Sequence, residues 1–166
     1  MKIRTLMLTA VVAMTAAPLA MAADPTDPTD PDPADAAVLR ECVAGKRADK
    51  AQHAACFELI VKRCFKAVGN DYDSTVRDCH RREEAAWDII LNEEYRALGA
   101  KLATAQMASL RDQQRAWIRG KDRKCDAIYK KLQGSMAYPL MAQCFNRETS
   151  QRVLYLMNYP AGDKAK

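Results

Sequence analysis

Two carboxylates have the spacing that acid–base chemistry requires. Glu84 and Asp88 are four residues apart, so a helix places them on one face, beside Trp87. Paired carboxylates cleave glycosidic bonds when one of them is removed from water. Arg81 and Arg82 precede this pair directly, and acids beside arginines on a helix are commonly surface ion pairs. We therefore expect a binding protein rather than an enzyme, with no catalytic residue.

The histidines and the glycines form no recognisable site. His53 and His80 each stand alone among polar residues, without ligand-like spacing and without a Cys-x-x-Cys pair. We expect both to be solvated surface histidines. The sequence has no glycine-rich phosphate loop, no nucleophile-elbow motif and no zinc-protease motif. It therefore predicts no metal site and no cofactor.

Residues 1–22 have the pattern of a secretory signal peptide. Lys2 and Arg4 form a positive start, and the apolar core that follows is too short to span a membrane. The small-x-small sequence at 20–22 is a cleavage site. We expect a bacterial periplasmic or secreted protein, soluble after cleavage of this peptide and without a transmembrane segment.

Charge is distributed unevenly along the chain. The full sequence has 26 basic and 21 acidic residues, a net charge of +5. From position 36 onward, which leaves out two basic and five acidic residues, it has 24 basic and 16 acidic residues and a net charge of +8. Outside the cytoplasm, such a body favours anionic envelope polymers over nucleic acid as partners in vivo. Residues 23–34 repeat Asp-Pro and predict a disordered acidic linker, or alternatively an arm that docks on the basic body.

Six cysteines in a short exported chain predict three disulfides. Pairing across three predicted turns joins Cys42 to Cys56, Cys64 to Cys79, and Cys125 to Cys144. Cys56 and Cys64 cannot pair within one regular helix, because the rise of the helix separates them by about 12 Å. The alternative arrangement joins Cys42 to Cys64 and Cys56 to Cys79.

Residues 35–160 are expected to form one all-α domain, a small bundle of about five helices. The predicted helices cover residues 35–45, 49–68, 74–105, 110–132 and 139–156. Asp35 and Ser74 are the predicted N-caps, Gly45 and Gly69 the predicted ends, and Pro139 fits a first helical turn. An apolar stripe on the third helix contains Trp87, Leu91, Tyr95, Leu98 and Leu102.

Acidic residues next to the apolar faces of two helices predict internal ion pairs. Asp88 follows the buried stripe directly, and Asp122 lies between Trp117 and the following cysteine. A half-buried acid requires a cationic partner, which Arg115, Arg147 or Arg152 would supply. We expect an Asp–Arg lock that joins the last three helices.

An ordered set of residues links the third, fourth and fifth predicted helices. The set is Trp87, Asp88, Leu91, Asn92, Tyr95, Leu98, Leu110, Arg111, Gln114, Arg115, Trp117, Asp122, Cys125, Gly134, Ser135, Cys144, Thr149, Arg152 and Leu156. In its order and spacing, this set resembles the LprI-type domain of lysozyme-inhibitor-like exported bacterial proteins, over about residues 79–156. The resemblance implies a small helical, disulfide-bonded domain that in some members binds and inhibits lysozyme.

The resemblance leads to a specific functional hypothesis. We expect a lysozyme-inhibitor-like protein that occludes a muramidase and protects peptidoglycan. Lys121, Arg123 and Lys124 are its candidate partner-binding residues, since their cations would meet the catalytic carboxylates of a sugar-binding cleft. The alternative is a periplasmic structural or interaction module that binds anionic envelope polymers through its basic face.

Overall fold

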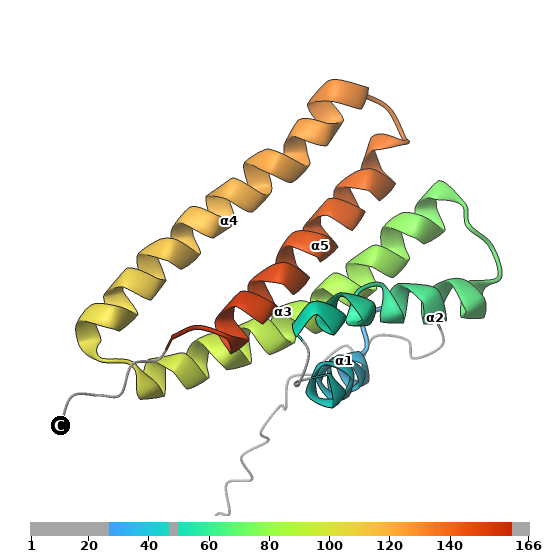
Figure 1. Ribbon diagram of the computed structural model, residues 1–166. Helices are drawn as coiled ribbons and strands as arrows, with labels where there is room; N and C mark the ends of the chain where they lie inside the picture. The colour runs from blue at the N-terminus through green and yellow to red at the C-terminus, as the bar shows by residue number, and fades with distance from the viewer. Residues whose placement is uncertain (1–26, 47–49, 161–166) are drawn as a thin grey trace, which may run out of the picture.

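The computed structural model describes residues 27–46 and 50–160, in which helices are joined by turns and no strand occurs (Figure 1). The elements are α1 (Pro33–Gly45), the 3-10 helix η1 (Lys50–Cys56), α2 (Leu59–Val68), α3 (Asp73–Lys101), α4 (Thr104–Leu132) and α5 (Ala137–Met157). The expected all-α class is confirmed. None of these described helices is both long and apolar enough to cross a membrane. The predicted signal peptide and residues 23–26 lie outside the described residues.

Helix α3 is the centre of the domain, because most of the other helices pack against it. α5 lies along one side of α3, α1 and α2 lie on the other, and α4 packs on α5 (Figure 1). The predicted stripe on α3 faces this core: Trp87, Leu91, Leu98 and Leu102 are buried, and Tyr95 is half-buried. Burial of this stripe against the neighbouring helices is an apolar contribution to the fold.

All three disulfides predicted across turns are present. They join Cys42 to Cys56, Cys64 to Cys79, and Cys125 to Cys144, with Cα–Cα distances of 5.9, 5.6 and 5.6 Å. The alternative pairing of the first four cysteines is therefore wrong. Each bridge joins two helical segments that are consecutive in the sequence and keeps them next to each other.

The predicted cap of the first helix is wrong by three residues. Asp32, not Asp35, is the N-cap of α1, and its Oδ1 accepts a hydrogen bond from the N–H of Ala34 at 2.8 Å. Pro33 then occupies the first helical position, where its missing N–H costs no hydrogen bond. Asp35 is instead buried in the first turn, because it pairs with Arg82 on α3.

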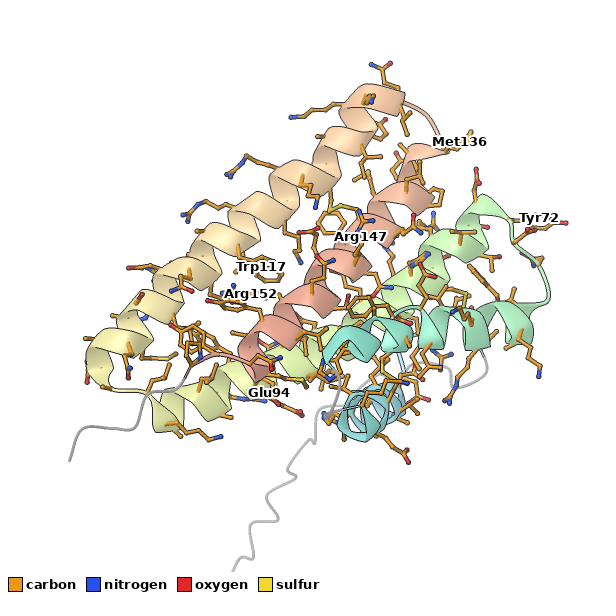
Figure 2. The ribbon with its side chains drawn as sticks, in the orientation of Figure 1. Tyr72, Glu94, Trp117, Met136, Arg147 and Arg152 are labelled. Carbon is orange, nitrogen blue, oxygen red and sulfur yellow. A yellow bond between two sulfur atoms is a disulfide. The ribbon has the colours of Figure 1, made fainter. Side chains whose placement is uncertain are left out.

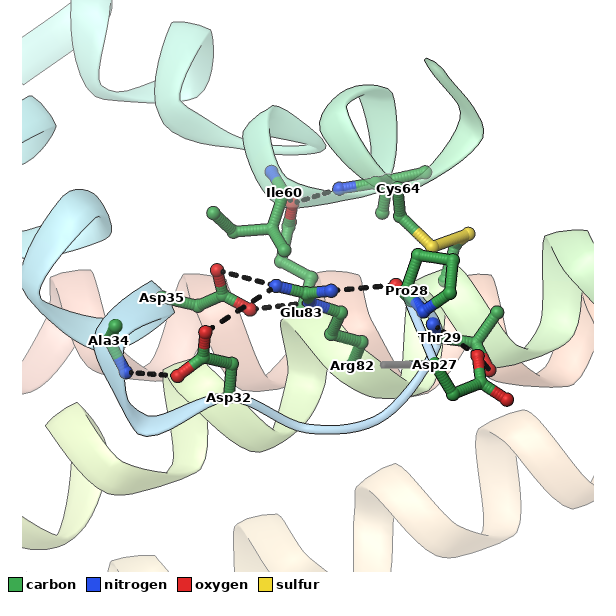
Figure 3. A network of polar contacts seen from close by, with 12 residues as sticks. Asp27, Pro28, Thr29, Asp32, Ala34, Asp35, Ile60, Cys64, Arg82 and Glu83 are labelled. Carbon is green, nitrogen blue, oxygen red and sulfur yellow. Dashed lines mark hydrogen bonds and ion pairs between the residues drawn. A yellow bond between two sulfur atoms is a disulfide. The ribbon is translucent and has the colours of Figure 1, made fainter. Parts of the chain in front are cut away.

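The described end of the acidic segment lies against α3 (Figure 3). Arg82 donates from Nε and Nη2 to the carboxylate of Asp35 at 2.6 and 3.1 Å, and from Nη1 to the backbone oxygen of Pro28 at 2.6 Å. The hydrogen bonds to Asp35 raise the pKa of Arg82 from its ordinary value. One guanidinium therefore joins residues 27–35 to the central helix.

The second predicted helix, 49–68, is wrong as a single element. Its described part is divided into η1 and α2 at Glu58, whose backbone is left-handed with φ 60°. No side chain next to this break caps α2. The carboxylate of Glu83 on α3 does so instead, because it accepts from the N–H groups of Glu58, Ile60 and Val61 at 2.8, 2.8 and 3.1 Å.

The boundary between the third and fourth helices also differs from the prediction. α3 ends at Lys101, four residues before the expected end, and α4 begins at Thr104, six residues before Leu110. Leu102 and Ala103 are extended between them, with ψ angles of 147° and 157°. Neither glycine nor proline marks this break. Burial of Leu102 in the core holds it in place.

The turn between α4 and α5 follows the prediction more closely. α4 ends at Leu132, and after its C-cap Gln133 comes Gly134 with φ 85°, a left-handed conformation that favours glycine. Pro139 lies in the first turn of α5, as expected, and is buried. The two helices are therefore antiparallel neighbours joined by a short turn (Figure 1).

Candidate protein-binding surface

Helix α4 lies at the edge of the domain, where it packs on α5 and buries few of its residues. Of its 29 residues, only Leu110, Gln114 and Cys125 are buried. The half-buried side chains between α4 and α5 must therefore supply most of the remaining packing. This arrangement leaves a long helix largely exposed to solvent.

A stack of cations and aromatic rings closes the space between α4 and α5. Nζ of Lys121 lies 5.1 Å from the Trp117 ring centroid, and the guanidinium of Arg152 lies 5.6 Å from it (Figure 2). Arg152 also stacks on Tyr155 at 4.4 Å and donates from Nε to Oε1 of Gln114 at 2.8 Å. Burial lowers the pKa of Arg152 from its ordinary value, but a guanidinium stays protonated in proteins. These residues hold together α4 and α5, which we call the α4–α5 hairpin.

The three candidate partner-binding cations have different surroundings. Lys121 is only 16% exposed at its side chain and pairs with Glu84 of α3 at 3.4 Å. Lys124 is exposed and pairs with Glu148 of α5 at 2.5 Å. Arg123 is exposed and forms no ion pair within the described part of the chain. Lys121 is thus an internal contact, whereas the other two cations face solvent.

The motif residues divide into core and surface positions. Trp87, Leu91 and Gln114 are buried; Tyr95, Trp117 and Arg152 are half-buried; and Asp88, Asn92, Arg115 and Asp122 are exposed. The expected Asp–Arg lock is therefore wrong. Asp88 accepts a hydrogen bond from Nδ2 of Asn92 at 2.9 Å, and neither Asp88 nor Asp122 forms an ion pair among the described residues. Both acids face water, which solvates a carboxylate without a cationic partner.

The carboxylates considered for catalysis share no cavity. Oε1 of Glu84 accepts from Lys121 at 3.4 Å and from Thr149 at 3.3 Å, at the contact of α3 with α4 and α5. Asp88 is on the exposed face of the same helix. Within the described ranges, no group of three or more His, Cys, Asp or Glu side chains is placed to hold a metal ion.

Both histidines are buried, so the expectation that they are solvated is wrong. His53 is 5% exposed and His80 is 3% exposed. Nδ1 of His80 lies 3.3 Å from Nδ2 of Asn146, which also donates to Oε1 of Glu83 at 3.0 Å. Burial lowers the pKa of His80, and the negative charges of Glu58 and Glu83 oppose this shift.

Helical spacing identifies the buried polar network that the sequence interpretation missed. Glu83 precedes Trp87 by four residues, and His80 precedes Glu83 by three, so both lie on the buried stripe of α3. Trp87 confirms this arrangement, since its Nε1 donates to Oε1 of Glu83 at 3.2 Å. Polar residues on a buried stripe indicate partners on neighbouring helices.

Exposed apolar side chains gather at one end of the domain. Of the eight large apolar side chains that are exposed in the described ranges, six come from the α2–α3 turn or from the α4–α5 turn and its flanks. These six, which we call the tip surface, are Tyr72, Tyr129, Leu132, Met136, Tyr138 and Leu140. Tyr72 and Met136 are the most exposed, at 72% and 67%, and mark neighbouring turns (Figure 2). Contiguous exposed apolar groups of this kind mark sites of interaction.

A groove of about 650 Å³ separates the two turns of the tip surface. Tyr72 and Arg77 line it from the α2–α3 side, and Ser135 and Tyr138 line it from the α4–α5 side. The rings of Tyr138 and Tyr129 lie 5.5 Å apart, which extends the aromatic surface onto α4. Two turns that are distant in the sequence thus form one end of the molecule.

The fold defines a class of small all-helical domains stapled by three disulfides. The profile of the family described as "Lysozyme inhibitor LprI" matches residues 64–156, which include α3, α4 and all but the last residue of α5. The chain belongs to this family. The match covers both turns of the tip surface and two of the three disulfides. No curated protein and no solved structure matches the chain.

Proposed function

We propose that this protein is a lysozyme-inhibitor-like binding protein that occludes a muramidase through the tip surface. The family assignment supports the kind of partner. One observation carries the choice of surface: six large apolar side chains are exposed together at two adjoining turns. Tyrosine and methionine are enriched at protein interfaces, and buried aromatic anchors often contribute most of the binding energy.

The position of the α4–α5 turn and the positive charge next to it favour insertion into a cleft. The α4–α5 turn lies at one end of the molecule (Figure 1), and Lys130 and Lys131 are exposed in the last turn of α4. Glycosidases use a pair of carboxylates at the scissile bond. A cationic hairpin with apolar anchors therefore complements such a cleft in charge and in chemistry. Arg123 and Lys124 remain proposed contacts on the same hairpin. We assign Lys121 no contact in this proposal, because its side chain is 16% exposed and pairs with Glu84.

The test is inhibition of lysozyme-catalysed lysis by the oxidised protein. Met136→Asp and Tyr72→Asp place a charge in the proposed apolar contact, and each should raise the inhibition constant at least about tenfold. Ile118→Asp is the matched control, because Ile118 is 43% exposed on α4 outside the tip surface. Equal inhibition by all three variants would remove the tip surface as the contact. Absence of inhibition by the unmodified protein would remove the function itself.

The outer face of α4 supports a second candidate function, binding to anionic envelope polymers. Arg111, Arg115, Arg119 and Arg123 recur every four residues and are all exposed. A stripe of this spacing forms one cationic face. Such binding should fall steeply as salt is raised, because exposed charges are screened. Paired reversal of Arg111 and Arg119 to Glu should abolish it and leave lysozyme inhibition unchanged, which separates the two functions.

We also propose that the protein acts in the periplasm or outside the cell. Three disulfides among the described residues fit an exported protein. Residues 1–22 are the proposed signal peptide and residues 35–160 the proposed LprI-like domain. Between them lies the acidic segment 23–34, whose described part contacts α3 at Pro28 and includes the first two residues of α1. Sequencing the amino terminus of the protein from a periplasmic extract tests this division: a start at residue 23 supports it, and a start at residue 1 contradicts it.

A further inference from the structure

A second hollow lies on the other half of α3, away from the tip surface. It has a volume of about 640 Å³ and is bounded by α1, by η1 and by the carboxyl-terminal parts of α3 and α5. We call it the acidic groove; its lining residues are Arg40, Glu41, Val43, Ala44, His53, Glu94, Met157 and Asn158. Glu94 lies near the end of α5 and far from Tyr72 and Met136 (Figure 2).

The acidic groove has an excess of negative charge in a basic protein. Its one lining cation, Arg40, is already bound, since Nε and Nη2 donate to the two carboxylate oxygens of Glu93 at 3.0 and 2.8 Å. Glu41 is exposed and Glu94 is half-buried, and neither forms an ion pair within the described part of the chain. Two carboxylates without cationic partners therefore face a hollow that a cation can enter.

His53 provides a second observation, independent of this charge. It is 5% exposed and lines the groove, and its Nε2 is buried without a hydrogen-bond partner among the described residues. Buried polar atoms in proteins are nearly always hydrogen-bonded, so an unpartnered one calls for a ligand. An unprotonated imidazole nitrogen accepts a hydrogen bond from an N–H donor.

The apolar walls narrow the class of ligand further. Val43, Ala44 and Met157 line the groove beside the polar groups. At one end, Asn158 donates from Nδ2 to the backbone oxygen of Leu154 at 2.7 Å, which leaves its Oδ1 as an acceptor. A ligand that satisfies all of these contacts has an alkyl chain and a terminal group with several N–H donors.

We propose that the acidic groove binds a protonated alkylamine, the chemistry of a lysine side chain. The alkyl chain packs on Val43, Ala44 and Met157. The ammonium group donates to the carboxylates of Glu41 and Glu94, and a small shift of the His53 ring brings Nε2 within reach as a third acceptor. The same chemistry has two sources, a lysine exposed on a partner protein and a free diamine. This site is separate from the tip surface and does not depend on muramidase binding.

The test is a titration of the oxidised, ¹⁵N-labelled protein followed by NMR. The two ammonium probes are Nα-acetyl-lysine methylamide, whose ε-amino group is free, and 1,5-diaminopentane. Nα-acetyl-norleucine methylamide is the control with the same backbone but no charge. We expect saturable shifts of the backbone amides of Ala44 and Asn158 and of the Nε2 resonance of His53. A lower Kd for the lysine probe assigns the source to proteins, and a lower Kd for the diamine assigns it to free amines.

Substitutions make the test specific to the groove. Glu94→Gln should raise the Kd of the better ammonium probe about tenfold, since a hydrogen bond to a charged group is lost. Asp126→Asn, which removes an exposed acid on α4, should leave it unchanged. Equal shifts with the norleucine control, no saturable shift with either amine, or a Kd that Glu94→Gln does not change would each overturn the proposal. If a variant fails to fold, the comparison of the amine probes with the norleucine control on the unmodified protein still tests the proposal.

Discussion

The carboxylate of Glu83 accepts a hydrogen bond from the N–H of Ile60 at 2.8 Å, so a side chain of α3 caps the start of α2. Glu83 is fully buried and also accepts from Trp87 and Asn146. It lies at the amino-terminal end of α2, where the first backbone N–H groups have no partner within their own helix. Helices α2, α3 and α5 thus meet at one carboxylate, at the point where the predicted second helix is interrupted.

Glu83→Gln tests how much this cap contributes to the free energy of unfolding. The amide retains one acceptor but places an NH₂ group against N–H donors of α2, so we expect the free energy of unfolding to fall by about 2–3 kcal/mol. Urea denaturation followed by circular dichroism measures this change. Asp88→Asn is the control on the exposed face of the same helix and should change it by less than about 0.5 kcal/mol. Similar losses in both variants would contradict a specific role for Glu83.

The features that could be predicted from the sequence are those set by local spacing. The cysteine pairs follow from the positions of turns, and the buried stripe from Trp87 to Leu102 follows from helical periodicity. These features depend on residues within one or two helices.

The features that could not be predicted depend on distant contacts. The break at Glu58 is compensated by Glu83, 25 residues later, and the break after Lys101 has no local stop signal. The spacing of residues within α4 predicts that Lys121 is a surface cation. Its side chain is internal because it contacts Glu84 of α3 and Phe145 of α5. The proposed apolar anchors lie in turns, where periodicity gives no information on exposure.

His80 predicts a specific dependence of stability on pH. Burial lowers its pKa in the folded protein from the ordinary value of 6.5. Below about pH 6.5, His80 is therefore protonated to a greater extent in the unfolded chain than in the folded protein. The stability from neutral His80 is therefore fully present above pH 6.5 and is lost as the pH falls toward the folded pKa. Unfolding free energies measured by urea denaturation between pH 7 and 5 should fall with pH, and His80→Gln should flatten this slope. An unchanged slope in the variant would assign it to other groups.

Arg82 is predicted to hold the acidic segment and α1 on α3. Its side chain is 17% exposed and that of Asp35 is 8% exposed, so Arg82→Met leaves a nearly buried carboxylate without its partner. We expect a loss of about 2–3 kcal/mol in the free energy of unfolding, and faster proteolysis near Pro28. Arg77→Met is the control, because the Arg77–Asp78 pair is 37% and 31% exposed and should contribute less than about 1 kcal/mol.

A double-mutant cycle separates the Arg82–Asp35 contact from other effects of the substitutions. If the two residues act through their direct ion pair, Arg82→Met combined with Asp35→Asn should cost less than the sum of the single variants. Additive losses would show that Arg82 stabilises the fold through Pro28 and its own packing instead.

The Cys125–Cys144 disulfide is predicted to control local opening of α4. α4 has few buried residues, and this bridge closes a separation of 19 residues, which in the chain-entropy model contributes about 3 kcal/mol. Replacing both cysteines by alanine should therefore accelerate hydrogen exchange of α4 amides while α3 amides stay protected, because α3 keeps its contacts with α1, α2 and the rest of α5. Replacing Cys64 and Cys79 is the matched control and should accelerate exchange in α2 instead. Equal acceleration in α3 and α4 would mean that the hairpin unfolds only with the whole domain; acceleration confined to α4 would mean that the disulfide holds the proposed muramidase-binding hairpin in its shape.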